Sequence, residues 1–299
     1  MSSKTTGFLP VLSCLIAATL WGLFWYPLRL LEQMGMPGLW ASVFIYISTF
    51  LPLLPGLWRH RSGLFKQPVM LGLIGLSAGW ANLGFILAML EGNVVRGLLL
   101  FYLSPIWTVI LGMLMLHEQL TRLAWLSIIM AMAGAVIMLG QPDAGLFIPT
   151  GKADLFAISA GFAFALMNVL IRKTGDIPII LKMGPTCAGV IILSVTGLLV
   201  LPSSSPTLNI STLSLAISVG GIGMLAMTYT AQYGVTHLPV HRSAVIFLFE
   251  IVAGAVSAAL LTDEVVTAKE WVGGGMVILA AWITALDSIQ VMKPRAQSK

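Results

Sequence analysis

The sequence contains few charged residues and only two cysteines. Of its 299 residues 9% are charged, whereas soluble domains carry roughly a quarter. Cys14 and Cys187 both fall inside apolar segments. The shortage of charge excludes an ordinary soluble domain. Two thiols in apolar segments predict packing residues, not a disulfide framework.

Signatures of catalysis and of ATP binding are also missing. The four histidines lie near segment boundaries, and the 11 acidic residues form no Asp-rich motif. Because an active site needs a nucleophile with a base, or clustered metal ligands, we expect no enzyme, no cofactor and no metal site. No Walker-type loop occurs, so any transport would depend on gradients or on the concentration of the cargo.

Long apolar segments dominate the sequence, which is 58% hydrophobic with a mean hydropathy of +0.96. About 20 apolar residues cross a bilayer as a helix. Ten segments meet this length, and they run over residues 8–30, 39–58, 69–90, 95–116, 123–139, 153–171, 180–201, 213–234, 243–261 and 271–289. The short connections predict an all-α integral membrane protein. The first segment lacks a cleavage site and is expected to be a retained helix.

Basic residues predict the orientation. With a cytoplasmic N-terminus, twelve of the 16 basic residues fall on the inside, namely Lys4, Arg59, Arg61, Lys66, Arg122, Arg172, Lys173, Lys182, Arg242, Lys293, Arg295 and Lys299. This asymmetry predicts a multi-pass cell-membrane protein, in the inner membrane if bacterial, with both termini cytoplasmic. The net charge of +5 forms no patch, so we expect no nucleic-acid partner.

A gapless internal repeat relates residues 94–125 to residues 240–271. The recurring pairs are Val94/Val240, Arg96/Arg242, Phe101/Phe247, Leu114/Leu260, Glu118/Glu264, Thr121/Thr267 and Trp125/Trp271. Five spans per copy require the second copy to enter the membrane from the opposite face. We therefore predict ten transmembrane helices as two inverted five-helix repeats around a central cavity. The first repeat is 1–140, the junction loop 141–151 and the second repeat 152–299.

Each repeat contains one corner between helices with a characteristic motif. Thr121 and Thr267 suit N-capping of the following helix, and Glu118 and Glu264 suit the positive end of a helix dipole. Glycines at helical spacing, such as Gly72, Gly75 and Gly79 and also Gly273, Gly274 and Gly275, predict close helix contacts.

The corner motif is Glu, two residues, Thr, three residues, Trp and then a Gly-rich helix, once per half. This pattern resembles the EamA family of the drug/metabolite transporter superfamily, including its bacterial exporters of aromatic and other amino acids. The resemblance implies a ten-helix bundle with a central cavity and export from the cytoplasm. It leaves the cargo open, because family members handle amino acids, metabolites, nucleotide sugars and drugs.

These features together predict a secondary transporter that exports amino acids or similar small metabolites by alternating access. The alternative is a broad-specificity exporter of cationic or aromatic drugs, which 16 methionines in an adaptable wall would suit. The expected partners are a small-molecule substrate and membrane lipids. The sequence does not indicate an oligomeric state, and a monomer is compatible with it.

Glu250 is the outstanding polar residue within a predicted span, with apolar residues on both sides. Such a carboxyl group marks a functional site by default. Three roles remain open: it binds a substrate ammonium group, it carries a coupling proton, or it is a protonated packing group.

Other midspan residues complete the predicted substrate site. The amides suit a zwitterion or else hydrogen bonds between helices, and the aromatic rings suit a cargo cage or else the packed core. The full set is Trp21, Trp25, Trp80, Asn82, Tyr102, Trp107, Asn168, Tyr229, Gln232 and Glu250.

Arg96 and Arg242 begin equivalent segments, where the helix dipole disfavours a cation. Either both side chains reach lipid phosphates, or each acts as a gate or attracts an anionic group at one mouth of the pathway.

Overall fold

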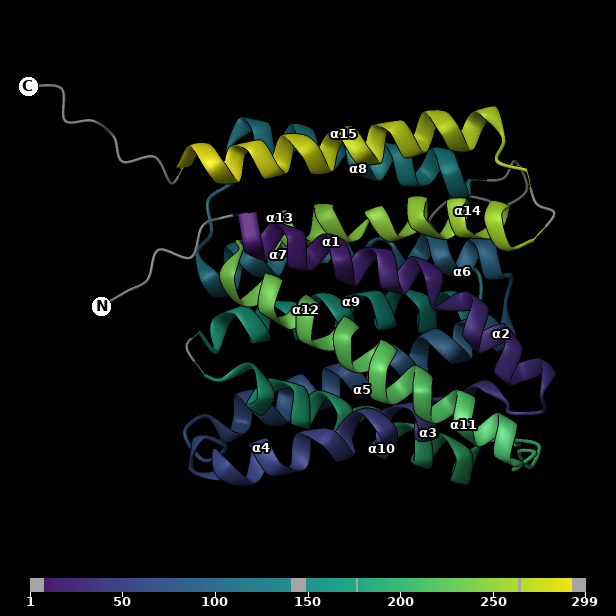
Figure 1. The fold of residues 1–299 in the computed structure, drawn as a ribbon. Coiled ribbons are helices and arrows are strands. Elements are labelled where there is room, and N and C mark those ends of the chain that lie inside the picture. Colours follow the sequence, from purple (N-terminus) through teal and green to yellow (C-terminus); the bar gives the residue numbers. More distant parts are fainter. Residues whose placement is uncertain (1–7, 141–148, 176, 263–264, 292–299) are drawn as a thin grey trace, which may run out of the picture.

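The computed structural model describes residues 8–140, 149–175, 177–262 and 265–291, with side chains up to residue 286. Over this part of the chain every regular element is helical (Figure 1), which confirms the all-α prediction. The elements are α1 (Phe8–Leu23), α2 (Trp25–Gln33), α3 (Gly38–Phe50), η1 (Leu51–Leu53), α4 (Leu54–Arg59), η2 (Arg61–Gly63), α5 (Pro68–Glu91), α6 (Val94–Phe101), α7 (Ser104–Leu116), α8 (Arg122–Leu139), α9 (Lys152–Lys173), α10 (Ile179–Val200), α11 (Ile210–Ser218), η4 (Val219–Met224, a π-helix), α12 (Leu225–His237), α13 (Val240–Phe247), α14 (Phe249–Leu261) and α15 (Ala268–Val291).

Within the described residues, nine helical segments are long and apolar enough to cross a membrane. They are α1–α2, α3–α4, α5, α6–α7, α8, α9, α10, α11–α12 and α13–α14. The predicted count of ten is not confirmed. The tenth predicted span corresponds to α15, a helix of 24 residues that packs along α8. Large apolar side chains are exposed on the outside of the bundle, as lipid contact requires; examples are Phe8, Leu76, Leu114, Leu199 and Ile222.

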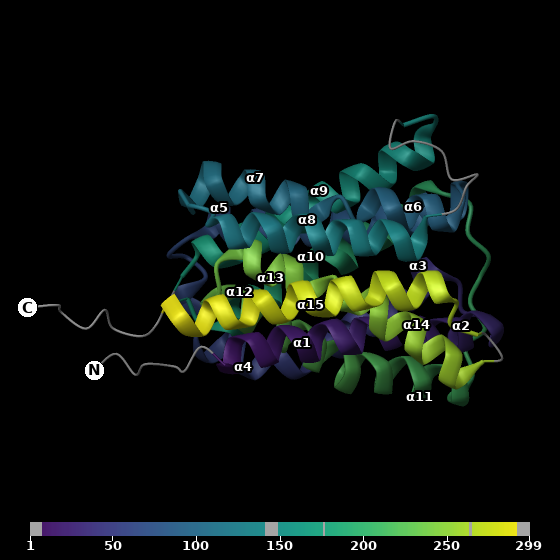
Figure 2. The same cartoon turned by 90° about the horizontal axis from the view of Figure 1, so that it is seen from above.

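The helices run side by side along one axis, so the bundle has two ends. Figures 1 and 2 place the start of α1 and the end of α4 together at one end, and α2 and α6 at the other. We call the first the basic end, because most of the described basic side chains are on helix termini and loops there: Arg59, Arg61, Lys66, Arg122, Arg172, Lys173, Lys182 and Arg242. The opposite end has Arg29, Arg96, Lys152 and Lys269.

The two equivalent corners lie at opposite ends of the bundle. The chain turns from α7 to α8 at the basic end and from α14 to α15 at the opposite end (Figures 1 and 2). Helices that are equivalent by the sequence repeat therefore run in opposite directions. The boundaries 1–140, 141–151 and 152–299 stay predictions, and residues 141–148 of the junction are outside the described chain.

Equivalent helices also exchange partners between the halves. The third span of the first half, α5, packs along α9, the first span of the second half. Reciprocally, α12 packs along α1, and the last spans, α8 and α15, pack against each other. Each half thus completes its core with helices of the other.

Glycines permit the closest of these contacts. A Cβ atom on Gly189 would overlap the carbonyl group of Gly75 where α10 crosses α5. Between α8 and α15, a Cβ on Gly134 would lie 2.6 Å from the Gly273 carbonyl oxygen, and the reverse distance is also 2.6 Å. The predicted contact faces are confirmed at these positions. They are wrong for Gly72 and Gly275, where an added Cβ meets nothing within 4 Å.

The two cysteines behave as predicted, since both are free and buried.

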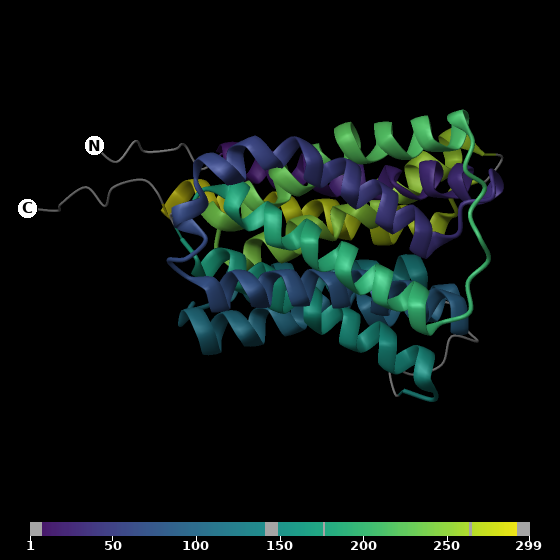
Figure 3. The same ribbon diagram turned by 90° about the horizontal axis from the view of Figure 1, so that it is seen from below.

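The long connection between α10 and α11 crosses the opposite end of the bundle (Figure 3). It is fixed there by a hydrogen bond from the Thr207 N–H to the Gly35 carbonyl at 2.8 Å.

Candidate functional site

Two membrane spans from opposite halves are interrupted at equivalent positions. The first break follows Phe101, the last residue of α6, and the second follows Phe247, the last residue of α13. Phe101 and Phe247 are one of the residue pairs that the sequence repeat relates. Pro105 in the first turn of α7 accounts for the first break, because proline has no N–H to continue the helix. Residues 248–250 contain no proline, so the sequence alone gave no signal for the second.

Several backbone N–H groups at the two breaks have partners within the chain. At the first break Leu103 donates to Leu100 O at 3.3 Å and Ile106 to Leu103 O at 2.9 Å. At the second, Leu248 donates to Val245 O at 3.2 Å and Ile251 to Leu248 O at 3.1 Å. These tight turns satisfy groups that a helix terminus otherwise leaves free.

Tyr102 and Glu250 join the two breaks. Tyr102 follows α6 directly, and its hydroxyl group donates a hydrogen bond to Glu250 Oε1 in the first turn of α14. Both side chains are partly exposed. The backbone of α1 passes very close to that of Glu250. A Cβ atom on Gly22 would lie only 2.5 Å from the Glu250 carbonyl oxygen, so there is no space for a side chain at this position. The carboxyl group of Glu250, predicted to lie at mid-depth in its span, therefore joins the two halves of the chain.

An aromatic cluster lies next to this pair. Trp21 on α1 packs edge-on against Phe247 and Phe164, with centroid distances of 5.1 and 5.8 Å. Phe101 contacts Phe164 at 5.7 Å and Tyr102 at 5.7 Å. Sequence reasoning named Trp21 and Tyr102 but missed the three phenylalanines as site residues. The signal was present for two of them, since Phe101 and Phe247 are a repeated pair.

The other predicted tryptophans lie at separate helix contacts. Trp25 Nε1 donates to Ser257 Oγ at 2.9 Å, which joins α2 to α14. Trp80 Nε1 donates to Ser159 Oγ at 3.1 Å, between α5 and α9. The Trp107 ring packs on Phe162, and its Nε1 has no hydrogen-bond partner in the described chain.

The predicted amides make contacts within or between helices. Ser194 Oγ donates to Asn82 Oδ1 at 3.5 Å, and Gln232 Nε2 donates to Thr186 Oγ1 at 2.9 Å. The buried Asn168 donates to the carbonyl of Phe164 at 3.0 Å. Tyr229 is 51% exposed and stacks on Tyr233. None of these contacts connects the four residues to the Tyr102–Glu250 pair.

Arg96 forms an ion pair at the opposite end. Its Nε lies 3.0 Å from both carboxylate oxygens of Asp154, and its Nη2 lies 2.9 Å from Oδ2. Asp154 also accepts from the Thr150 N–H at 2.8 Å. The interpretation that Arg96 extends to lipid phosphates is therefore wrong, because a carboxylate in the first turn of α9 holds the guanidinium group.

Glu118 forms the corresponding contact at the basic end. Its carboxylate accepts from the Val240 N–H at 3.0 and 3.2 Å and lies 3.0 Å from His241 Nδ1. Arg172 Nε lies 4.0 Å away, and Arg172 also donates to Thr236 O. Glu118 thus binds the N-terminus of α13 in the other half, and not that of α8, which follows it in sequence. Glu264 lies outside the described residues.

The corner threonines cap their helices as predicted. Thr121 Oγ1 accepts from the Ala124 N–H at 3.1 Å. Thr267 and Glu270 form a reciprocal capping pair, in which the Thr267 N–H donates to Glu270 Oε2 at 2.7 Å and the Glu270 N–H donates to Thr267 Oγ1 at 3.3 Å.

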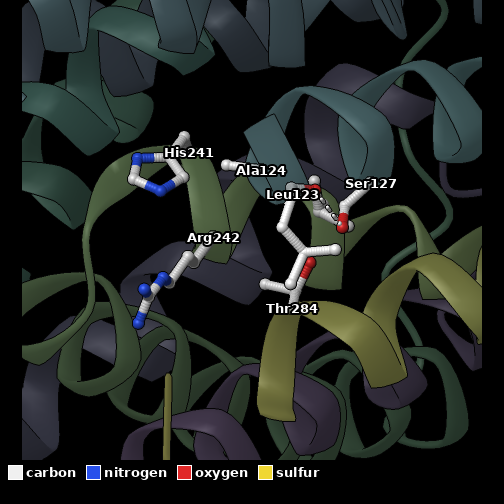
Figure 4. Close-up of a pocket in the computed structure, with 7 residues that line it drawn as sticks. Leu123, Ala124, Ser127, His241, Arg242 and Thr284 are labelled. Carbon is white, nitrogen blue, oxygen red and sulfur yellow. Dashed lines mark hydrogen bonds between the residues drawn. The ribbon is translucent and has the colours of Figure 1, made fainter. Parts of the chain in front are cut away.

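Arg242 is buried beside a small pocket between α8, α13 and α15 (Figure 4). Its labelled neighbours in Figure 4 include His241, Ser127 and Thr284. Burial contradicts the interpretation that Arg242 extends to the lipid surface. Arg242 lies in the first turn of α13, whereas Glu250 lies in α14, beyond the break that follows Phe247. The residues that line the pocket include neither Tyr102 nor Glu250.

The family match lies in the first half of the chain. Residues 8–140, which span α1 to α8, match the model of the EamA-like transporter family. Together with the nine apolar helical segments of the described chain, this match supports a multi-pass membrane protein.

Curated relatives of the chain align over part of their length. RarD of Salmonella typhi is 29% identical over 119 residues, 39% of this chain and 38% of RarD. The uncharacterized transporter YojE of Bacillus subtilis is 28% identical over 172 residues, 53% of this chain and 54% of YojE. The chain thus spans about half the length of these relatives or less, and neither name states a cargo.

A solved crystal structure matches the whole bundle. The TM-score is 0.74 at 17% identity, and the match covers 95% of this chain and 98% of that chain. This likeness shows that the chain shares its fold with that structure.

Proposed function

We propose that the chain is a transporter that moves small molecules across the membrane by alternating access. The observation that carries the proposal is the pair of breaks at equivalent positions of two oppositely directed spans, joined by Tyr102 and Glu250. Broken spans with a polar group at mid-depth, located where two inverted units meet, are typical of transporter binding sites. The match to the EamA-like transporter family supports the same conclusion.

In this mechanism each end of the bundle has a latch between the halves. The Glu118 carboxylate on the N-terminus of α13 holds the basic end, and the Arg96–Asp154 ion pair holds the opposite end. A pathway that opens at one end must separate the latch there while the other stays closed. Arg96 has a gating role in this proposal, and Arg242 supports the basic end from within α13.

The proposed cargo is an amino acid or a similar small metabolite, exported from the cytoplasm. Tyr102 and Glu250 form the proposed central contact, with Trp21 in the aromatic cluster next to it. The other candidate residues make contacts elsewhere in the bundle, and they are Trp25, Trp80, Asn82, Trp107, Asn168, Tyr229 and Gln232. The basic end is proposed to face the cytoplasm, by the positive-inside rule.

The test is flux in proteoliposomes that contain the purified full-length chain. Labelled amino acids and lipophilic cations are assayed in counterflow, with and without a pH gradient. We expect uptake above that of protein-free vesicles for at least one compound. Glu250→Gln should reduce this uptake at least about tenfold, as expected when a charged hydrogen bond is lost. The matched control is Glu32→Gln, an exposed glutamate on α2, which should leave uptake unchanged. Absence of flux for every compound under both conditions would contradict the proposal.

A further inference from the structure

We infer that the site at Tyr102 and Glu250 recognises the protonated amine of its cargo and provides no matching group for a carboxylate. The cargo class that fits is an aromatic or apolar amine, with amino acids bound through their ammonium group. This inference deepens the proposed function at the same site, and binding tests it independently of flux.

Glu250 supplies the negative charge. Its described side-chain partner is the Tyr102 hydroxyl, a neutral donor, and the described ion pairs involve other carboxylates. In the hydrogen bond from the Tyr102 hydroxyl only the carboxylate carries a charge. A substrate ammonium group that replaces the hydroxyl would place opposite charges on both sides of the hydrogen bond, the kind of pair that proteins use for strong, specific recognition.

The aromatic cluster supplies an apolar wall with a negative face. Trp21, Phe164 and Phe101 remain partly exposed although they are in contact with one another. Phe164 belongs to α9, which packs against α5, α6, α7, α12 and α13 and is therefore the central helix. Aromatic faces attract cations within about 6 Å and accept apolar rings. The wall therefore suits an amine that carries a ring or a bulky apolar group.

The described basic side chains and several backbone donors that could hold a carboxylate are engaged elsewhere. Helix N-termini bind anions through free N–H groups, and at the breaks the N–H groups of Leu103, Ile106 and Ile251 are bonded within the chain. The described basic side chains are near the helix ends, where Arg96 binds Asp154 and Arg172 binds Glu118 and Thr236. Arg96 is six residues from Tyr102, about 9 Å along the helix.

Three probes with the same phenyl ring test the inference on the full-length chain in detergent. Phenethylamine carries the ammonium group alone, phenylalanine carries both charges, and 3-phenylpropionate carries the carboxylate alone. Titration calorimetry should show phenethylamine binding at least as tightly as phenylalanine. The affinity for 3-phenylpropionate should be at least about tenfold weaker, as for a ligand that lacks a charged hydrogen bond.

Substitutions test whether the amine binds at Glu250, and whether the loss of binding has a cause other than disturbed packing. Glu250→Gln should weaken phenethylamine binding about tenfold to a hundredfold, whereas Glu32→Gln should not change it. Tyr102→Phe should preserve or strengthen binding, because the displaced hydroxyl no longer competes. The probe order in the unaltered chain tests the inference even if Glu250→Gln does not fold.

The inference is overturned if 3-phenylpropionate binds as tightly as the amine, if phenylalanine binds tenfold tighter than phenethylamine, or if the amine does not bind. Phenylalanine flux in vesicles without amine binding would overturn the inference and leave the proposed function standing. Amine binding that depends on Glu250, without flux of any compound, would support the inference and contradict the proposed function.

Discussion

A single proline explains why α13 takes its N-terminal cap from the other half, whereas α6 does not. Asn93 begins α6 and accepts from the Arg96 N–H at 3.0 Å, so this helix carries its own cap. The equivalent residue before α13 is Pro239, which has no side-chain acceptor. The carboxylate of Glu118, from the other half, fills that role at 3.0 Å from the Val240 N–H.

We therefore expect Glu118→Ala to destabilise the chain by about 0.5–2 kcal/mol, the range for loss of an N-cap. The removal also leaves His241 and Arg172 without the carboxylate that they share. Thermal unfolding in detergent measures the effect, with Glu32→Ala as the control. Equal unfolding midpoints for the two variants would show that the cap contributes nothing to the stability of the chain.

Helix pairs in this protein are held by close backbone contact, because apolar burial gives little drive for association in lipid. The contrast between Gly189 and Gly72 makes this testable. Both are in helices, but an added Cβ overlaps the Gly75 carbonyl in one case and meets nothing within 4 Å in the other.

Gly189→Ala should destabilise the chain by about 1–3 kcal/mol, the usual cost of overpacking. Gly72→Ala should be neutral or stabilise by up to about 1 kcal/mol, because alanine has the better helix propensity. Unfolding midpoints of the two variants provide the measurement. A stable Gly189→Ala would mean that α5 and α10 separate without cost.

At the scale of the whole molecule, the distribution of basic residues predicts which end faces the cytoplasm. Ser62, between α4 and α5, is exposed at the basic end, and Ser203, between α10 and α11, is exposed at the opposite end. The positive-inside rule places the first in the cytoplasm and the second outside.

Single cysteines at these two positions test the orientation once Cys14 and Cys187 are replaced by serine. A membrane-impermeant maleimide added to right-side-out vesicles should label Ser203→Cys at once. Ser62→Cys should react only after permeabilisation. The reverse labelling pattern would invert the proposed direction of transport.

The sequence predicted the helical class and the inverted repeat, because the length of an apolar segment and a duplicated motif can both be read directly from the order of residues. It also identified Glu250, since a carboxyl in an apolar span is conspicuous. It could not tell which of many aromatic residues face Glu250. In a helix that is apolar all round, periodicity does not distinguish the lipid face from the protein face. Trp80 and Trp107 therefore seemed equivalent to Trp21, and Phe164 was missed.

The exchange of partners between the halves has a consequence for biogenesis. Since α1 packs on α12 and α14, and α5 packs on α9 and α10, the helices synthesised first enter the bilayer before their final neighbours exist. The face of α1 that packs on α12 and α14 must remain in lipid until translation of the second half is nearly complete. Assembly is thus a late event in which two inserted bundles interlock, and two separately expressed halves should regain activity only when they are made in the same cell.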